Sequence, residues 1–280
     1  MAKLWLGGEL DLRDLTVSGE VDASGAAYGV TVLRGPRPGW PDSMLDVAEL
    51  AGRHGGSQGP ALYEPLRLDL LLSVRGGSHA DAQEKLDAVR QLLARDRAGA
   101  RTLRVGLLAD RFWVAQHETI EPPREIGVTR RFRATFVAAD PRAWGVDRVV
   151  QEETIAADPQ SVDVPAEGVV AGTADTEPVW IVEIGAGGAG NVGLSNETTG
   201  ESVTYAPESS LSEGDRVRFD AGLRQIVELS TDGGSSWTPV MSDVTVSRAI
   251  PVLRAGVQNS VEVTGVGAGG LDVIYRPRWW

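Results

Sequence analysis

Apolar and polar residues alternate with a period of two along much of this 280-residue chain. The clearest example is RFRATFVAADPRAWG, residues 131–145, whose apolar positions are Phe132, Ala134, Phe136 and Ala138. Such alternation predicts a half-buried β-strand. We expect the strand to end at Asp140-Pro141, because proline cannot donate a ladder hydrogen bond and restricts the residue before it.

The same alternation predicts strands in both halves of the chain. In the first half the apolar positions of these strands are Tyr28, Val30, Val32; Leu66, Leu68, Leu70, Leu72, Val74; and Leu103, Val105, Leu107. After Glu177 only strands are expected, at Pro178–Ile184, Ser202–Tyr205, Arg216–Phe219, Gln225–Leu229, Val244–Val246, Val261–Val263 and Leu271–Tyr275. Short strands separated by Gly and Asn turns are typical of a β-sandwich or barrel.

One segment, Ser78–Arg97, has helical periodicity instead. Its apolar residues are spaced four, three and four apart, which places them on one face: Ala82, Leu86, Val89 and Leu93. Ser78 and Asp81 form a start that resembles a capping box, and arginines stand near the expected C-terminal end. We predict a single amphipathic helix that packs against a sheet.

The composition becomes polar and acidic after Trp144, in VDRVVQEETIAADPQSVDVPAEG. This segment is typical of a connection or a loosely held edge strand. We therefore place a domain boundary near residue 148, giving domains 1–148 and 149–280, each long enough to bury its own core. The predicted fold is mainly β, with one helix packed on an N-terminal sandwich or barrel, followed by a second β-sandwich.

The charge and the residue types exclude several classes of function. The formal net charge is -12, from 27 basic and 39 acidic residues, which argues against a dedicated nucleic-acid binder. The absence of cysteine excludes disulfides and thiolate metal sites. The N-terminal MAKLWLGGELDLRDL lacks the organisation of a signal peptide, and no run of eighteen apolar residues exists. We expect a soluble protein that is made in a cytoplasm and does not enter a membrane.

Two motifs have a functional and a structural interpretation. GAGGAG, Gly185–Gly190, fits the dinucleotide fingerprint, but the sequence after it lacks the helical periodicity that a pyrophosphate site needs, so we expect a tight loop between strands.

STDGGSSW, Ser230–Trp237, fits the Asp-box pattern. Here Asp232 is expected to accept hydrogen bonds from the turn, and Trp237 to pack beneath it, which makes the box structural.

No catalytic, metal or cofactor site is predicted. The three histidines, His54, His79 and His117, lie far apart without metal-ligand spacing. The nucleophile-elbow pattern is absent, and no pair of carboxylates stands out as an acid–base dyad.

Eight tryptophans remain, and tryptophan serves core packing, sugar stacking and interface anchoring alike. Trp180 and Trp237 are the candidates for sugar stacking. Trp144, Trp279 and Trp280 are candidates for subunit or domain contacts, because an exposed pair at positions 279 and 280 would favour aggregation.

Taken in order, these segments resemble the distal tail proteins of long-tailed bacteriophages, the siphovirus distal tail protein family. VTVLRGPRPGW and AGRHGGSQGPALYEP are similar to the Gly/Pro-rich loops of the family's N-terminal ring domain. LRLDLLLSV, the single helix, RFWVAQHETI and FVAADPRAW follow in the family's order. EPVWIVEIG, the turn Asn196–Gly200, Leu253–Asn259 and Tyr275–Trp279 are similar to the galectin-like sandwich that comes after it.

The resemblance implies a non-enzymatic virion protein of the tail tip, made in the bacterial host cytoplasm. It implies a homohexamer that joins the tail tube protein to the tail-tip hub protein and anchors receptor-binding or fibre proteins. DNA would pass through the ring without specific binding, and the net charge suggests an acidic lumen that repels phosphate. The alternatives are a carbohydrate-binding adhesion protein of the tail tip, or another tail-tube or baseplate ring component. A cell-wall hydrolase would need converging acids, for which the sequence offers no pattern.

Overall fold

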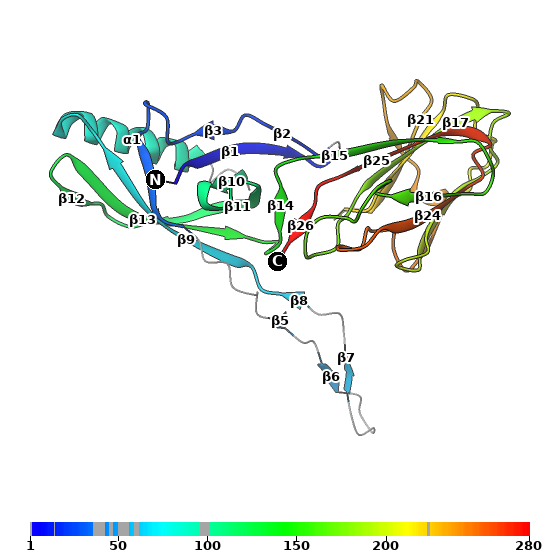
Figure 1. Cartoon of the computed structure of the whole chain (residues 1–280), viewed down its shortest axis with the longest axis horizontal. Coiled ribbons are helices and arrows are strands. Elements are labelled where there is room, and N and C mark those ends of the chain that lie inside the picture. The colour runs from blue at the N-terminus through cyan, green and yellow to red at the C-terminus, as the bar shows by residue number, and fades with distance from the viewer. Residues whose placement is uncertain are drawn as a thin grey trace. The chain divides into compact units, whose positions relative to one another are not determined.

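The structure, a computed structural model, describes residues 2–13, 15–35, 43–44, 47–49, 56–58, 62–95, 101–222 and 225–280. The chain divides into two compact units (Figure 1). One consists of Met1–Leu10, Val17–Val146 and Trp280, and the other of Asp11–Thr16 and Asp147–Trp279. The described residues are mainly β-strands with a single α-helix, which confirms the predicted fold class.

The N-terminal sheet has the strand order β2-β1-β10-β11-β13-β9-β4, and β3, β12 and β14 pair with β1, β13 and β11. Its strands are β1 (Leu4–Asp11), β2 (Thr16–Ser18), β3 (Val21–Asp22), β4 (Val30–Arg34), β9 (Leu66–Arg75), β10 (Arg101–Val105), β11 (Arg111–Ile120), β12 (Arg124–Ile126), β13 (Thr129–Ala138) and β14 (Ala143–Gly145). A bridge between Ala2 and Val32 joins the β1 side to β4, so the sheet closes like a barrel. Two further antiparallel pairs are β5 (Ser43–Met44) with β8 (Leu62–Tyr63), and β6 (Val47–Glu49) with β7 (Gly56–Gln58).

Strand β13 carries the alternation that the sequence predicts. It pairs with β9 along its whole length, from Thr129 opposite Arg75 to Ala138 opposite Leu66. The four predicted apolar residues, Phe132, Ala134, Phe136 and Ala138, are all buried. After the strand ends, the Asp140 carboxylate accepts hydrogen bonds from the backbone N–H and the guanidinium of Arg142, which holds the turn at Pro141.

Figure 1 shows the helix α1 (His79–Arg95) beside the N-terminal sheet. Its Leu86, Val89 and Leu93 belong to the same buried cluster as Phe132 and Phe136 of β13. Ser78 is its N-cap, because its hydroxyl accepts a hydrogen bond from the Asp81 N–H at 3.1 Å. The Asp81 carboxylate reaches back to the Gly77 N–H at 2.6 Å, one residue earlier than in a standard capping box. The predicted C-terminal residue Arg97 lies outside the described residues.

The predicted strand through Leu107 is too long. β10 ends at Val105, and a 3-10 turn, η2 (Gly106–Leu108), follows. The Gly106 N–H donates to the Lys3 carbonyl at 2.8 Å, and a Cβ at residue 106 would lie 2.6 Å from the Lys3 backbone nitrogen. This close approach turns the chain, so Leu107 does not continue the alternation.

The second unit is a sandwich of two antiparallel sheets, with orders β15-β25-β17-β20-β21-β22 and β16-β24-β18-β19-β23. Their bounds are β15 (Val149–Ile155), β16 (Gln160–Val164), β17 (Val179–Ala186), β18 (Val192–Asn196), β19 (Glu201–Tyr205), β20 (Arg216–Asp220), β21 (Ile226–Ser230), β22 (Thr238–Pro239), β23 (Val244–Ser247), β24 (Asn259–Thr264) and β25 (Ala268–Tyr275). A 3-10 turn, η3 (Met241–Asp243), and a short strand, β26 (Arg278–Trp279), complete the unit. Trp180 and Phe219 of one sheet and Leu194 and Val261 of the other share one buried cluster.

The polar segment after Trp144 forms two edge strands rather than a connection. β15 is the edge of the six-stranded sheet and β16 the edge of the five-stranded sheet. Both contribute to the core through Ile155, Val162 and Val164. Apart from the exposed Val150, their outward residues are polar or charged, which is how natural sheets protect an edge from pairing with another chain.

Candidate functional site

The outward face of the six-stranded sheet concentrates charged and aromatic side chains on adjacent strands. Residues directly opposite each other in antiparallel strands lie on the same face. Arg218 on β20 stands opposite Glu228 on β21 and Ile181 on β17, and Arg216 stands opposite Glu183. Ile181 in turn faces Asp272 on β25. This outward face is the candidate binding surface of the second unit.

Arg218 and Glu228 form a buried ion pair at the centre of the face. Both side chains are about one-tenth exposed or less. The Arg218 guanidinium donates to one carboxylate oxygen of Glu228 from Nε at 2.8 Å and also from Nη2. Removing one partner would leave a buried unpaired charge, which is far more destabilising than the pair itself is stabilising.

The half-buried Trp237 is the aromatic element of this surface. Its ring lies against the guanidinium of Arg218, with 4.1 Å between the guanidinium carbon and the ring centroid. An arginine over an indole is a favourable cation–π arrangement. It also means that one ring face is already covered, so a sugar could use only the other face. Sugar stacking on Trp237 stays a prediction.

The Asp box, in the turn that precedes Trp237, is held by the Asp232 carboxylate, as the sequence predicts. The Ser230 hydroxyl and the Ser236 N–H donate to one oxygen of Asp232 at 2.7 and 2.9 Å, and the Ser236 hydroxyl donates to the other at 2.6 Å. These hydrogen bonds hold the pKa of Asp232 well below its usual range. Gly233 and Gly234 have positive φ angles of 72° and 97°, a conformation that favours glycine. Both oxygens of the Asp232 carboxylate accept hydrogen bonds from residues of the turn, so the box is a structural element.

Two other carboxyl groups on this face have pKa values above the usual range. Burial raises the pKa of Asp220, and the hydrogen bond from the Gly222 N–H only partly offsets it. Burial also raises the pKa of Asp272, and the negative charge of Glu152 adds to the effect. The ionised forms of both groups therefore cost folding free energy.

Trp180 lies on the opposite side of this sheet, in the core. Its side chain is fully buried, and its indole N–H donates to the Pro251 carbonyl at 2.9 Å. No ring face is open to a ligand, so the proposal of sugar stacking on Trp180 is not supported. The alternation of β17 does place Trp180 inward, but the sequence does not show which face of the strand the second sheet covers.

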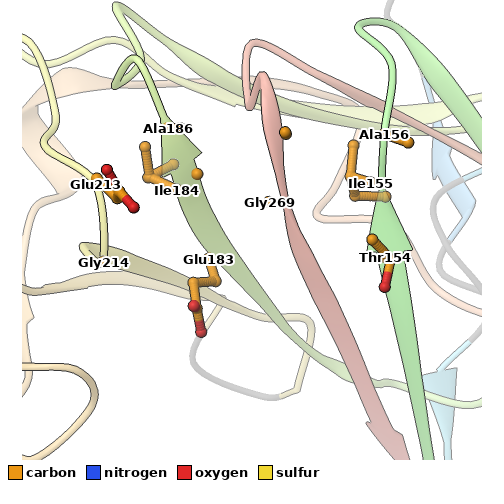
Figure 2. A pocket seen from close by; sticks show the side chains of 11 residues that line it. Thr154, Ile155, Ala156, Glu183, Ile184, Ala186, Glu213, Gly214 and Gly269 are labelled. Carbon is orange, nitrogen blue, oxygen red and sulfur yellow. The ribbon is translucent and has the colours of Figure 1, made fainter.

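An open cavity of about 530 Å³ lies at one end of the six-stranded sheet. Figure 2 shows Thr154 and Ile155 of β15 on one side, Glu183 and Ile184 of β17 on the other, and Gly269 of β25 between them. Glu183 is already ion-paired with Arg216. The lining contains no nucleophile with a neighbouring base, so the cavity has no catalytic constellation.

GAGGAG forms the end of β17 and the turn after it, as predicted. The Gly188 N–H donates to the Gly185 carbonyl, and the next element is strand β18, so no helix terminus is present for a pyrophosphate. A Cβ at residue 185 would lie 0.8 Å from the Ala268 carbonyl oxygen. Glycine at residue 185 therefore allows the backbones of the paired strands β17 and β25 to approach each other closely at this point.

The three candidate contact tryptophans lie in different surroundings. Trp144 is buried on β14 opposite Phe112, and Trp279 is half-buried on β26. Trp280 packs against the exposed Tyr63, with ring centroids 4.4 Å apart and planes tilted by 49°. Subunit or domain contacts through these tryptophans stay predictions.

The described residues hold no group of three or more histidine or acidic side chains that could bind a metal ion. His54 lies outside the described residues, His79 is exposed in the first turn of α1, and His117 is buried edge-on against the Phe136 ring. Within the described ranges, no helix has the length and apolar character needed to cross a membrane.

The sequence matches no protein-family model, and no curated protein matches it. Solved structures do match over nearly the whole chain. The SPP1 Dit protein, described as a paradigm of the hub adsorption apparatus in phages that infect Gram-positive bacteria, has a TM-score of 0.64 at 12% identity and covers 99% of both chains.

This chain has the fold of the phage Dit hub proteins. The resemblance that the sequence motifs predict is thereby confirmed for the fold. A chain of the phage P2 baseplate in its activated conformation with Ca has a TM-score of 0.50 at 9% identity, covering 98% of both chains, and the form with Sr gives the same values. Both units of the chain, and not one alone, therefore fall within the Dit fold.

Proposed function

We propose that this chain is a non-enzymatic structural protein of the tail tip of a long-tailed bacteriophage. It assembles as a homohexameric ring that joins the tail tube protein to the tail-tip hub protein and anchors receptor-binding or fibre proteins. The observation that supports this proposal is the match of the whole chain, in both units, to a hub adsorption protein and to baseplate chains. The virion tail tip is its proposed location.

In this proposal residues 1–148 form the ring and residues 149–280 form the galectin-like domain. The barrel-like closure of the N-terminal sheet and the helix packed on its core give the first part a compact body that could serve as a ring subunit. The second part is a separate sandwich with its own core, able to carry contacts to other tail-tip proteins.

The negative charge is distributed unevenly between the two parts of the chain, and this changes the charge expected for the lumen of the ring. Residues 1–146 contain 19 basic and 19 acidic residues, whereas residues 147–280 contain 8 and 20. The whole excess of -12 thus belongs to the second part. Net charge of the ring-forming part therefore does not support an acidic lumen, and we propose a near-neutral one through which DNA passes without being held.

The mass of the assembled protein tests this function. Native mass spectrometry of the purified full chain is expected to show a species of six copies. A monomer at every protein concentration and salt concentration would contradict the ring.

Carbohydrate binding is the second candidate, favoured by the half-buried Trp237 on a polar sheet face. A glycan array with the full chain tests it, with Trp237→Ala expected to abolish any signal. Trp5→Ala is the matched control, because Trp5 is also half-buried and also lies 4.1 Å from an arginine, Arg104, but in the other unit. No glycan bound by the wild-type chain, or equal binding by Trp237→Ala, would contradict this candidate.

A further inference from the structure

Four arginines share the outward face of neighbouring strands in the N-terminal sheet. All four side chains are exposed to solvent. They are Arg34 of β4, Arg75 of β9, Arg124 of β12 and Arg131 of β13. We call these four residues the basic patch.

The strand register places the basic patch on one surface. Arg131 stands opposite Arg124 on β12 and opposite Ser73 on β9, and Arg75 follows two residues after Ser73, so these side chains lie on the same face. Strand β4 pairs with the other edge of β9 and adds Arg34 to that face. Neighbouring strands lie about 5 Å apart, so the four strands span about 15 Å. One partner surface can therefore reach all four guanidinium groups.

The ion pairs of the described residues set the basic patch apart from the other arginines of the sheet. The others each lie between 2.6 and 3.4 Å from a carboxylate oxygen: Arg67, Arg101, Arg104, Arg111, Arg130 and Arg133. Within the described part of the first unit, the basic residues without such an ion pair are the basic patch and Lys3, whose ammonium lies 5.9 Å from the Trp5 ring centroid. The uncompensated positive charge of this unit is thus concentrated on one face.

The acids of the first unit do not form a surface that matches the basic patch. Most of the described ones are already in ion pairs: Glu9, Glu20, Asp81, Asp87, Asp110, Glu118, Glu121, Glu125 and Asp140. The described acids without an ion pair are Asp22 on β3, Glu64 before β9, Asp69 on β9 and Glu84 on α1. These four belong to separate segments. Because residues 1–148 form the proposed ring, a second copy is a poor source of the negative partner surface.

The composition of the patch favours a protein as its partner. Ile126 lies on the same face of β12 as Arg124 and is 49% exposed. Arginine forks bind carboxylates through two parallel hydrogen bonds, and protein interfaces are enriched in arginine beside apolar side chains. A nucleic-acid backbone would leave Ile126 without an apolar neighbour, and the net charge of -12 of the chain repels it.

We propose that the basic patch docks an acidic surface of a different protein, whose carboxylates pair with the arginines and whose apolar side chain covers Ile126. The inference rests on the proposed function for one point, that this protein is another component of the tail tip. Every copy in the ring presents the patch, so a partner with several acidic segments binds through several contacts at once.

Poly-L-glutamate is the probe for the basic patch. Fluorescence anisotropy of the labelled polymer with the full chain at low salt is expected to show binding by the wild type. Arg124→Gln/Arg131→Gln is expected to bind about fivefold or more weakly, because it removes two of the exposed charge pairs. The fourfold variant, with all arginines of the patch changed to glutamine, is expected to lose binding.

Arg248→Gln/Arg254→Gln is the matched control. It removes the same charge at two exposed arginines of the second unit, which also have no ion pair with the described residues, and it is expected to bind like the wild type. The thermal unfolding midpoint of Arg124→Gln/Arg131→Gln is expected to equal or exceed that of the wild type, because arginines directly opposite each other repel. Weaker binding by this variant is then a loss of contact and not of fold.

The outcomes separate this surface from other partners and from the ring. No binding by the wild type, or equal binding by the fourfold variant, would overturn the inference. Duplex DNA that binds through the same arginines as tightly as poly-L-glutamate of equal charge would overturn it in favour of a nucleic acid. Loss of the oligomer by Arg124→Gln/Arg131→Gln in native mass spectrometry would overturn it in favour of a contact between copies. A wild type that binds poly-L-glutamate but stays monomeric would contradict the proposed ring and leave the patch standing.

Discussion

Asp232 and Asp272 belong to the same sandwich, yet their pKa values move in opposite directions. Asp232 accepts hydrogen bonds from the Asp-box turn, which favours its ionised form, whereas Asp272 is partly buried beside Glu152. Asp232 therefore stabilises the fold above its unfolded pKa of about 4, and this contribution is lost as the pH falls through its folded pKa. Asp272 has the reverse linkage, since its raised folded pKa makes the fold less stable as the pH rises above about 4.

Replacing Asp272 by asparagine is expected to stabilise the protein at pH 7, because the variant removes a charge that burial and Glu152 disfavour. The gain should shrink toward pH 4, where the wild-type carboxyl becomes protonated. Thermal unfolding between pH 4 and pH 7 measures this trend. Asp163→Asn, at an exposed position on β16, is the matched control for the exchange of aspartate for asparagine. A lower midpoint for Asp272→Asn at pH 7 would contradict the assignment.

Trp180→Ala is expected to cost about 3–5 kcal/mol of unfolding free energy, because it empties a large buried site. Trp180→Phe should cost less, since it keeps most of the packing. Its remaining cost comes partly from the Pro251 carbonyl, which loses its hydrogen bond. Urea unfolding of both variants measures these values. A cost below about 1 kcal/mol for the alanine variant would contradict a core role for Trp180.

At the scale of elements, helix α1 depends on its first turn. Ser78→Ala removes the acceptor for the Asp81 N–H and is expected to cost about 1 kcal/mol. Ser78→Asp keeps a capping oxygen and should remain near the wild type. Chemical denaturation followed by circular dichroism distinguishes them, and equal losses in both variants would contradict a capping role.

The elements that the sequence predicts well are those whose period is set by a single buried face. β9 and β13 alternate regularly because one side faces the core, and α1 shows its apolar stripe for the same reason. β15 and β16 were harder to predict, because an edge strand needs few apolar residues. The end of β10 depends on the distant Lys3, which no local pattern reveals.

The candidate site was predictable only where its chemistry is local. The Asp box is contiguous in sequence, so its turn and the role of Asp232 could be predicted. The Arg218–Glu228 pair depends on the register of β20 and β21. The only signal in the sequence is a charged residue within each of two otherwise apolar stretches, VRF and VEL. The burial of Trp180 depends on the second sheet, which strand periodicity alone does not locate.

At the scale of the whole molecule, the two parts differ in charge more than in architecture. Both are β-structures with their own cores, but the net charge is zero in residues 1–146 and -12 in residues 147–280. The second parts of neighbouring copies should therefore repel each other, and association of copies should strengthen as salt rises, because screening shortens the range of exposed charges. Sedimentation velocity from about 0.05 to 0.5 M salt measures this dependence, and assembly that weakens as salt rises would point to contacts between opposite charges instead.

The proposed function requires that copies of this chain form a six-fold ring. Negative-stain electron microscopy of the purified full chain shows whether they do. Closed rings with six-fold symmetry and a central opening wide enough for duplex DNA are expected. Particles that are only monomers, or open filaments without closure, would contradict the proposed function.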